Sequence, residues 1–156
     1  MAVAITIQHY LEDHGIKYNI VPHEYSRHSM ETAEKAHIHG DQVAKCVMLE
    51  DESGFLAAVL PATHRIQFNR LTDLTHRHLK MANEQELADT FGDCVLGAVP
   101  PLGNVYDVKV ICDDAICEHN DVYFESGDHT DLIHVSGDDF RSLMASALHG
   151  RFSHHM

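Results

Sequence analysis

The sequence predicts one α/β domain in which helices wrap a mixed, mostly antiparallel sheet. Strand-like and helix-like patterns are interspersed along the chain, and tight-turn signals join several of the strands. A length of 156 residues suits one domain, and no low-complexity linker or shift of composition divides the chain. We therefore expect a single domain over residues 1–156 that ends in a frayed tail at residues 150–156.

The first part of the chain is expected to contain a helix, a strand and a second helix. Residues 4–13 carry apolar side chains near helical spacing, and Gly15 follows as a stop signal. Residues 17–21 alternate between polar and apolar side chains as a strand does. Residues 31–39 have the pattern of a short helix, which Gly40 closes.

The middle of the chain predicts a hairpin and two further helices. Residues 45–49 and 55–60 are two strands joined at 51–54, Asp-Glu-Ser-Gly, which is a good hairpin signal. Residues 66–79 place apolar side chains along one face of a helix. Residues 83–92 begin with capping-box spacing and end at a glycine, as a helix would.

The last part predicts three strands and a final helix. Residues 105–112 and 121–125 have strand patterns, and residues 132–135 are the expected partner of the second of these. Residues 136–139, Ser-Gly-Asp-Asp, are typical of a helix start and precede a helix expected at 140–148.

The charge of the chain limits what it can bind alone. Lys and Arg number 11 against 24 Asp and Glu, so the formal net charge is −13 with neutral histidines. A surface that grips RNA phosphates normally carries a positive patch, which disfavours unaided binding of a whole tRNA. Protonating all 15 histidines would add 15 positive charges to −13 and give +2, so the net charge of the protein is sensitive to mild acid.

The sequence also indicates a compartment. No apolar run approaches the roughly 20 residues that span a bilayer, and the N-terminal segment lacks the basic region of a secretory signal. The four cysteines form no CxxC pair, which favours reduced thiols. We expect a cytoplasmic protein that does not associate with a membrane.

Residues 97–103, Gly-Ala-Val-Pro-Pro-Leu-Gly, are the most distinctive stretch. Two glycines and two prolines in seven residues cannot continue a helix or lie inside a central strand. Apolar segments flank the loop, so we expect it to be held between core segments. Backbone N–H groups of such a stiff loop can bind a carbonyl oxygen or a phosphate, and a connection that only turns the chain is the alternative.

Four short motifs occur in order along the chain: Thr32-Ala33-Glu34-Lys35-Ala36, Asp41-Gln42-Val43-x-Lys45, Gly97-x-x-x-Pro101-Leu102-Gly103 and Ser126-Gly127. Each motif alone is weak, but the ordered set resembles the YbaK/prolyl-tRNA-synthetase-associated editing domain family. The resemblance covers nearly the whole chain, to about Phe140. It implies the mixed sheet wrapped by helices that is the architecture of this family, and aminoacyl-tRNA deacylase activity.

Lys45 is the first candidate site residue. Lysines are scarce in this chain, and this one abuts an apolar strand, where a fixed cation could bind a phosphate or a developing oxyanion. A desolvated lysine could also act as a base, and a surface lysine at a strand end is the alternative. The resemblance implies that Lys45 is essential and helps to seat the terminal aminoacyl-adenosine.

The resemblance implies roles for two further segments. The loop from Gly97 to Pro101 would position the aminoacyl carbonyl for attack by water. Ser126 and Gly127 would line the amino-acid pocket. Three other polar side chains are weaker pocket candidates: His23, Thr32 and His129.

No cofactor or metal is expected. The pairs His37-x-His39 and His76-x-His78 fall on or next to predicted helices, where this spacing makes the two imidazoles diverge. Cys112 and Cys117 fit no standard zinc spacing. An activated ester can be cut by orientation and carbonyl polarisation alone, so the expected reaction needs no metal.

The sequence thus predicts a trans-acting deacylase that hydrolyses a mischarged amino acid from tRNA. Its expected partners are the acceptor end of a mischarged aminoacyl-tRNA and, as an open question, an aminoacyl-tRNA synthetase that delivers it. The alternative is a non-catalytic member of the same fold that binds a small amino-acid-like or nucleotide-like ligand or a partner protein. The acidic composition favours this alternative.

Overall fold

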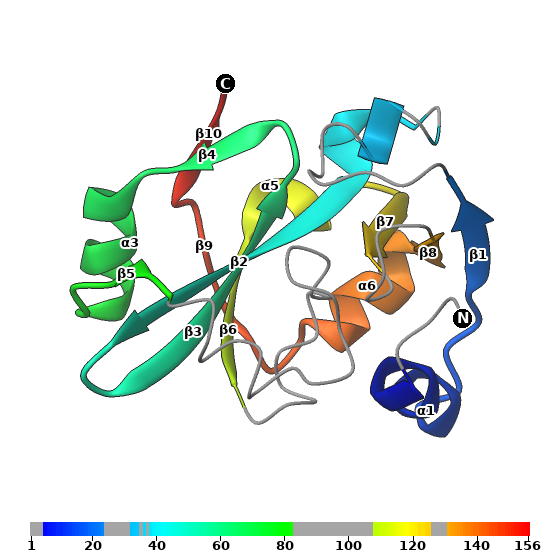
Figure 1. The fold of residues 1–156 in the computed structure, drawn as a ribbon, viewed down its shortest axis with the longest axis horizontal. Helices are drawn as coiled ribbons and strands as arrows, with labels where there is room; N and C mark the ends of the chain where they lie inside the picture. The colour runs from blue at the N-terminus through cyan, green and yellow to red at the C-terminus, as the bar shows by residue number, and fades with distance from the viewer. Residues whose placement is uncertain (1–4, 24–31, 35, 37, 83–107, 126–130) are drawn as a thin grey trace.

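The computed structural model describes residues 5–23, 32–34, 36, 38–82, 108–125 and 131–156 (Figure 1). Its centre is an eight-stranded mixed sheet in the order β1-β8-β7-β2-β3-β6-β9, with β5 paired to β2. The strands of this sheet are β1 (Asn19–Pro22), β2 (Val43–Asp51), β3 (Gly54–Pro61), β5 (Lys80–Met81), β6 (Lys109–Asp113), β7 (Asp121–Glu125), β8 (Asp131–Ser136) and β9 (Leu148–Gly150). The predicted fold class is confirmed.

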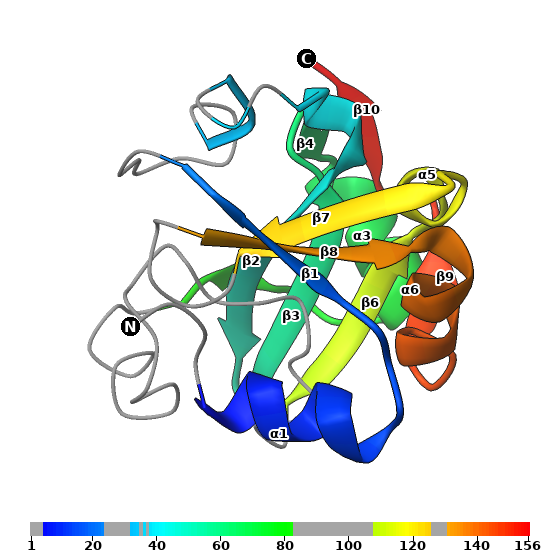
Figure 2. The same cartoon turned by 90° about the vertical axis from the view of Figure 1, so that its right-hand side faces the viewer.

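The remaining elements lie around this sheet. A separate antiparallel pair is formed by β4 (His64–Ile66) and β10 (Ser153–His155). The helices are α1 (Ile5–Asp13), α3 (Phe68–Thr75), α5 (Asp114–Cys117) and α6 (Gly137–Leu143), and η1 (Gly40–Gln42) is a single 3₁₀ turn. Figure 2 shows α1 at one end of the sheet and the β4–β10 pair at the other. No helix in the described ranges is long and apolar enough to cross a membrane.

The β2–β3 hairpin is the longest pairing of the sheet, and it was predicted. The two strands pair antiparallel from Ala44 with Pro61 to Asp51 with Gly54. Gly54 has φ of 120°, a backbone conformation that side chains with a Cβ rarely adopt. Arg77 donates to both carboxylate oxygens of Asp51, at 2.8 and 2.7 Å, and thereby ties the hairpin turn to the segment after α3.

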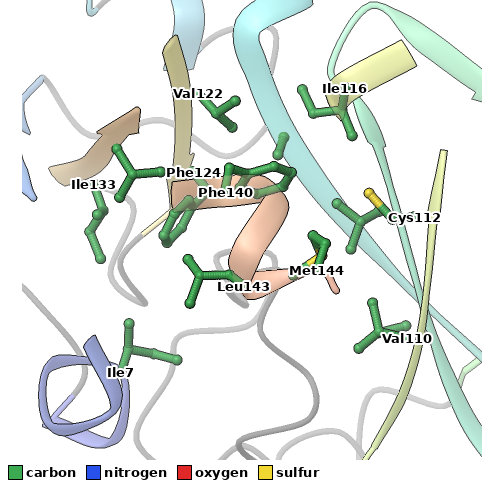
Figure 3. Close-up of a cluster of buried hydrophobic side chains, with 14 of the residues drawn as sticks. Ile7, Val110, Cys112, Ile116, Val122, Phe124, Ile133, Phe140, Leu143 and Met144 are labelled. Carbon is green, nitrogen blue, oxygen red and sulfur yellow. The ribbon is translucent and has the colours of Figure 1, made fainter. Parts of the chain in front are cut away.

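The larger hydrophobic cluster lies between α6 and the sheet (Figure 3). Phe140 and Leu143 of α6 and Met144, which follows it, pack with Phe124 of β7 and with Ile7 of α1. Both phenylalanine rings are fully buried, and their centroids are 6.4 Å apart. Truncating a buried phenylalanine to alanine typically costs about 3–5 kcal/mol, so this cluster is a principal source of stability.

A second cluster lies on the opposite face of the sheet. Leu49 of β2, Leu60 of β3 and Ile111 of β6 meet Leu71 of α3 and Phe152 there. The alternation of side chains along a strand explains the division, because neighbouring residues of β2 point to opposite faces. In both ribbon views α3 and α6 accordingly lie on opposite sides of the sheet (Figures 1 and 2).

Two predicted helices differ in extent from the observed ones. The helix expected at 66–79 is α3 (Phe68–Thr75), and it ends because His76 adopts a left-handed conformation with φ of 57°. The helix expected at 140–148 is α6 (Gly137–Leu143), which starts where Ser136 accepts a hydrogen bond from the Asp139 backbone N–H. Residues 148–150 instead form β9, which pairs parallel with β6.

The prediction of a frayed tail at residues 150–156 is wrong. Ser153–His155 form β10, which pairs antiparallel with β4, and Phe152 is fully buried. The Asp113 carboxylate accepts hydrogen bonds from the backbone N–H groups of Phe152 and Ser153, both at 3.0 Å. The tail is ordered because a buried side chain and a buried carboxylate both hold it.

Candidate active site

Lys45 is the third residue of β2 and lies on the face opposite the larger cluster. Val43 packs with Ala33 and Ala62, and Val47 packs against the cluster that contains Leu49, on this same face. The strand therefore places the lysine stem between two apolar clusters. Lysine stems tolerate such surroundings provided that the ammonium group finds polar partners.

Two backbone carbonyls hold the ammonium group of Lys45. Its Nζ donates to the His64 carbonyl at 2.6 Å and to the Ala62 carbonyl at 3.5 Å. Burial lowers the pKa of Lys45 below its ordinary value, and the nearby positive charge of Arg65 lowers it further. An ammonium group has three N–H donors, so these two bonds fix the direction of the third.

The turn that supplies these carbonyls is braced from the other side by Asp41. Thr63 donates a short hydrogen bond from its hydroxyl to Asp41 Oδ1. This hydrogen bond holds the pKa of the Asp41 carboxyl below its usual value. The Asp41 carboxylate also lies 3.6 Å from the ring of His155 and 3.8 Å from that of His39. Hydrogen bonds to Asp41 and from Lys45, both motif residues, thus hold the turn between β3 and β4 in place.

Thr32 and Glu125 form a buried polar pair on the same face. The Thr32 hydroxyl donates to Glu125 Oε1 at 2.9 Å, and the two residues are 0 and 4 % exposed. Glu125 ends β7, and Tyr123, two residues before it, packs against the cluster that contains Val43. Side chains two apart on a strand share a face, so Glu125 lies on the face of Lys45.

The strand register gathers the described candidates at one end of the sheet. Val43 pairs with Tyr123, so the register extended by two residues brings Lys45 level with Glu125. Glu125 pairs with Leu132 of β8, which pairs with Val21 of β1. His23, which is half-buried, follows two residues later. Neighbouring strands lie about 4.8 Å apart, so this row crosses roughly 14 Å from β2 to β1.

A serine, a histidine and an aspartate near Lys45 do not form a nucleophilic triad. The Ser153 hydroxyl donates to Asp113 Oδ2 at 2.7 Å and lies 2.9 Å from Nδ1 of His64. The serine proton is therefore engaged by the carboxylate, and the ring of His64 donates to the serine oxygen. A triad needs the reverse order, with histidine between serine and aspartate. Ser153 is a structural link between β4 and β10.

A hollow elsewhere in the structure is unrelated to these residues. It has a volume of about 540 Å³, and its described lining comes from β6, the end of α6 and the segment up to β9. Val110 and Met144 in its wall belong to the larger cluster, on the face of the sheet opposite Lys45. We do not assign the hollow to the candidate site.

Five predicted site residues lie outside the described ranges: Gly97, Pro101, Ser126, Gly127 and His129. The helix expected at 83–92 lies there too. Among the described candidates, Lys45 and Thr32 share a face, and His23 stands at the same end of the sheet. Sequence reasoning missed Glu125, whose only signal was its place at the end of a predicted strand directly before Ser126-Gly127.

Comparison with known families decides the affiliation. A family model described as the aminoacyl-tRNA editing domain matches residues 23–143, which is more than half of the chain. The chain belongs to the aminoacyl-tRNA editing domain family. The matched range runs from His23 through Lys45 and Glu125, so the family match contains every described residue of the candidate site. A comparison with curated protein sequences gives no significant match.

Solved structures support the fold of this editing domain. A candidate trans-editing enzyme for prolyl tRNA synthetase is similar with a TM-score of 0.82 and 21% identity, over 97% of this chain and 96% of that one. The hypothetical protein APE2540 is similar with a TM-score of 0.82 and 19% identity, over 96% and 99% of the two chains. A candidate signal transduction protein from Marinobacter aquaeolei VT8 has a TM-score of 0.76 at 20% identity, over 96% of this chain and 30% of that one.

Proposed function

We propose that this protein is a trans-acting aminoacyl-tRNA deacylase, which hydrolyses the ester of a mischarged amino acid on tRNA. The observation that carries the proposal is the held ammonium group of Lys45, in a chain of the editing domain family. Its two carbonyl bonds orient the remaining N–H, which can meet an oxygen of the substrate. The proposal places the reaction in the cytoplasm, where translation consumes aminoacyl-tRNA.

The proposed reaction uses water as the nucleophile. The water oxygen attacks the ester carbonyl carbon, the bond from this carbon to the ribose oxygen breaks, and the ribose oxygen takes up a proton. Lys45 seats the terminal adenosine or its phosphate. The backbone of the Gly97–Pro101 loop holds the carbonyl and stabilises the oxyanion that forms on it. The chemistry needs neither a covalent enzyme intermediate nor a metal, since the ester is already activated.

We also propose roles for several polar residues in the pocket that would bind the amino acid. The pair of Thr32 and Glu125 presents buried polar atoms at the sheet end where the predicted pocket residues Ser126 and Gly127 follow in sequence. A buried carboxylate at this position would bind the ammonium group of an aminoacyl ester. His23 and His129 are candidates for the outer part of the pocket.

The competing function is non-catalytic binding of an amino-acid-like or nucleotide-like ligand, or of a partner protein. The observation in its favour is the formal charge of −13, which opposes unaided binding of tRNA. A synthetase that delivers the tRNA would remove this difficulty, so such a partner belongs to the proposal.

A panel of mischarged tRNAs separates the two functions. We expect accelerated hydrolysis of at least one mischarged tRNA and little hydrolysis of the correctly charged forms, measured by release of the labelled amino acid. Binding of a non-hydrolysable aminoacyl-adenosine analogue without hydrolysis of any member of the panel, with or without synthetases present, would contradict the deacylase and support the binding protein.

A further inference from the structure

Three potential metal ligands meet at the sheet edge formed by β6 and β9. Cys112 lies on β6, Cys117 ends α5, and His149 lies on β9. One ligand atom from each lies within 4.8 Å of the other two. The two Sγ atoms are 3.3 Å apart. This cluster contains no residue of the candidate active site.

The backbone explains why these distant residues converge. The parallel register of β6 and β9 places Cys112 directly beside His149. Asp113 caps α5 by accepting a hydrogen bond from the Ala115 backbone N–H at 2.9 Å, and the short helix returns Cys117 toward the strand. Figure 3 shows Cys112 at the margin of the larger cluster, near Ile116 of α5. Three backbone elements therefore fix the three ligands.

We propose that Cys112, Cys117 and His149 bind one thiophilic transition-metal ion, with Zn²⁺ as the preferred ion. Two thiolates and one imidazole are a donor set that zinc takes readily, with one position left open. Cys112 is fully buried, whereas His149 is exposed, so the open position faces solvent and would hold water. The proposal is independent of the deacylase activity.

The distances fit this ion after a small adjustment. A tetrahedral zinc site with Zn–S bonds of about 2.3 Å separates its sulfurs by roughly 3.8 Å. The two sulfurs therefore need to move apart by about half an ångström when the ion replaces the thiol protons, which are released to solvent. Exposure of His149 and partial exposure of Cys117 leave room for this movement.

The surroundings orient the histidine, and the positive charge nearby is paired. Nε2 of His149 lies 2.8 Å from the Met144 carbonyl, which can only accept a hydrogen bond. A neutral ring that donates from Nε2 carries its lone pair on Nδ1, and a hydrogen bond of this kind commonly orients a metal-bound imidazole. The nearby guanidinium of Arg141 is paired with Asp138 at 2.6 Å, so its charge is largely compensated.

The proposed ion would join the last strands to the sheet. It links β6 and α5 to β9, and the chain continues from β9 into β10, which pairs with β4. We therefore expect a structural ion that raises the thermal midpoint of unfolding.

Cobalt provides the test, because thiolate ligation of Co²⁺ gives a sulfur-to-metal charge-transfer band that histidine ligation does not. The full-length reduced protein is stripped of metal and titrated with Co²⁺, and then with Zn²⁺. We expect a thiolate band that saturates at one equivalent, disappears when zinc is added, and accompanies a higher thermal midpoint with either ion.

Variants identify the ligands. Cys117→Ser should diminish the band, because only the Cys112 thiolate remains, and His149→Ala should weaken cobalt binding at least about tenfold. Cys46→Ser alters a half-buried cysteine elsewhere and should leave the band unchanged. His149 is exposed, so its variant remains informative even where a cysteine variant fails to fold.

Several results would overturn the proposal. One is cobalt binding without a thiolate band, which would indicate the exposed histidines alone. Another is a band of unchanged intensity and cobalt affinity in both Cys117→Ser and His149→Ala. A third is a disulfide between Cys112 and Cys117, seen by mass spectrometry as the loss of two hydrogens, in a protein whose reduced form binds no metal ion.

Discussion

Nζ of Lys45 lies 2.6 Å from the backbone carbonyl oxygen of His64, to which it donates a hydrogen bond across the turn between β3 and β4. The bond joins a motif residue to a part of the chain that no motif marks. It explains why the lysine is held although its stem lies among apolar side chains. The described structure thus shows a held ammonium group at the residue that the proposal assigns to substrate binding.

The buried pair of Thr32 and Glu125 should contribute to stability. Thr32→Val keeps the shape of the side chain but leaves Glu125 Oε1 without the hydroxyl donor at 2.9 Å. Loss of one partner of a buried hydrogen bond typically costs about 1–3 kcal/mol, so the free energy of unfolding should fall by that amount. Urea denaturation measures it, with Thr72→Val on α3 as the control. An unchanged free energy of unfolding in Thr32→Val would show that the hydrogen bond contributes nothing.

Acid should weaken the ion pair between Asp51 and Arg77, which we call the hairpin clamp because it ties the β2–β3 turn to the segment after α3. The hydrogen bonds from Arg77 lower the pKa of Asp51 from 3.8 to about 2 in the folded protein. A lowered carboxyl pKa adds stability above the unfolded value, and this stability disappears as the pH falls through the folded value.

The matched variants for this prediction are Asp51→Asn and the exposed Asp73→Asn. Between about pH 4 and about pH 2 the free energy of unfolding of Asp51→Asn should fall less steeply than that of the wild type, while Asp73→Asn should follow the wild type. Denaturant titrations at several pH values test this. Identical slopes for the wild type and Asp51→Asn would refute the role of the clamp.

Elements held by contacts between residues close in sequence could be predicted, whereas elements held by contacts between distant residues could not. The hairpin of β2 and β3 was predicted because its turn residues and its two apolar runs are adjacent in sequence. The pairing of β10 with β4 was not, because it joins residues that are far apart in sequence, such as Arg65 and His154, and rests on the burial of Phe152. The end of α3 was missed because His76 adopts a left-handed conformation without being a glycine.

The same limit applies to the candidate site. Lys45 was predicted because its motif is local, while its carbonyl partners on Ala62 and His64 became visible only in the structure. Cys112 and Cys117 fit no zinc spacing in the sequence, and the parallel register of β6 with β9 brings His149 to them.

The glycine loop yields a prediction from sequence alone. Gly97→Val should reduce deacylation by about 100-fold or more, because in the proposed mechanism a side chain there would displace the backbone donors that bind the substrate carbonyl. Gly103→Val should cost less activity, because we expect that glycine to serve only the turn. Single-turnover hydrolysis and thermal midpoints of both variants provide the comparison. Equal losses of activity with equal losses of stability would point to a structural role for the whole loop.

Affinity for RNA should depend on pH through the histidines. With −13 formal charges and 15 histidines, the protein becomes less negative as the pH falls through the imidazole range. Affinity for a labelled acceptor stem should therefore be higher at about pH 5.5 than at about pH 7.5, and salt should weaken it. Fluorescence anisotropy at two salt concentrations measures both effects. An affinity that changes with neither pH nor salt would show that histidine protonation does not control RNA binding. It would leave the deacylase proposal intact.

We propose that the ammonium group of Lys45 serves catalysis. Lys45→Met keeps most of the aliphatic stem and removes the charge. The fold should therefore persist, and the free energy of unfolding should fall by roughly 1–3 kcal/mol because the two hydrogen bonds to backbone carbonyls are lost. Lys80→Met, at an exposed position of β5, is the matched control.

The most direct measurement is the single-turnover rate of hydrolysis of the mischarged tRNA on which the wild type is most active. We predict that Lys45→Met, shown to be folded by circular dichroism, has no activity above the uncatalysed rate, while Lys80→Met retains the wild-type rate. A folded Lys45→Met protein that hydrolyses this tRNA as fast as the wild type would contradict the proposal.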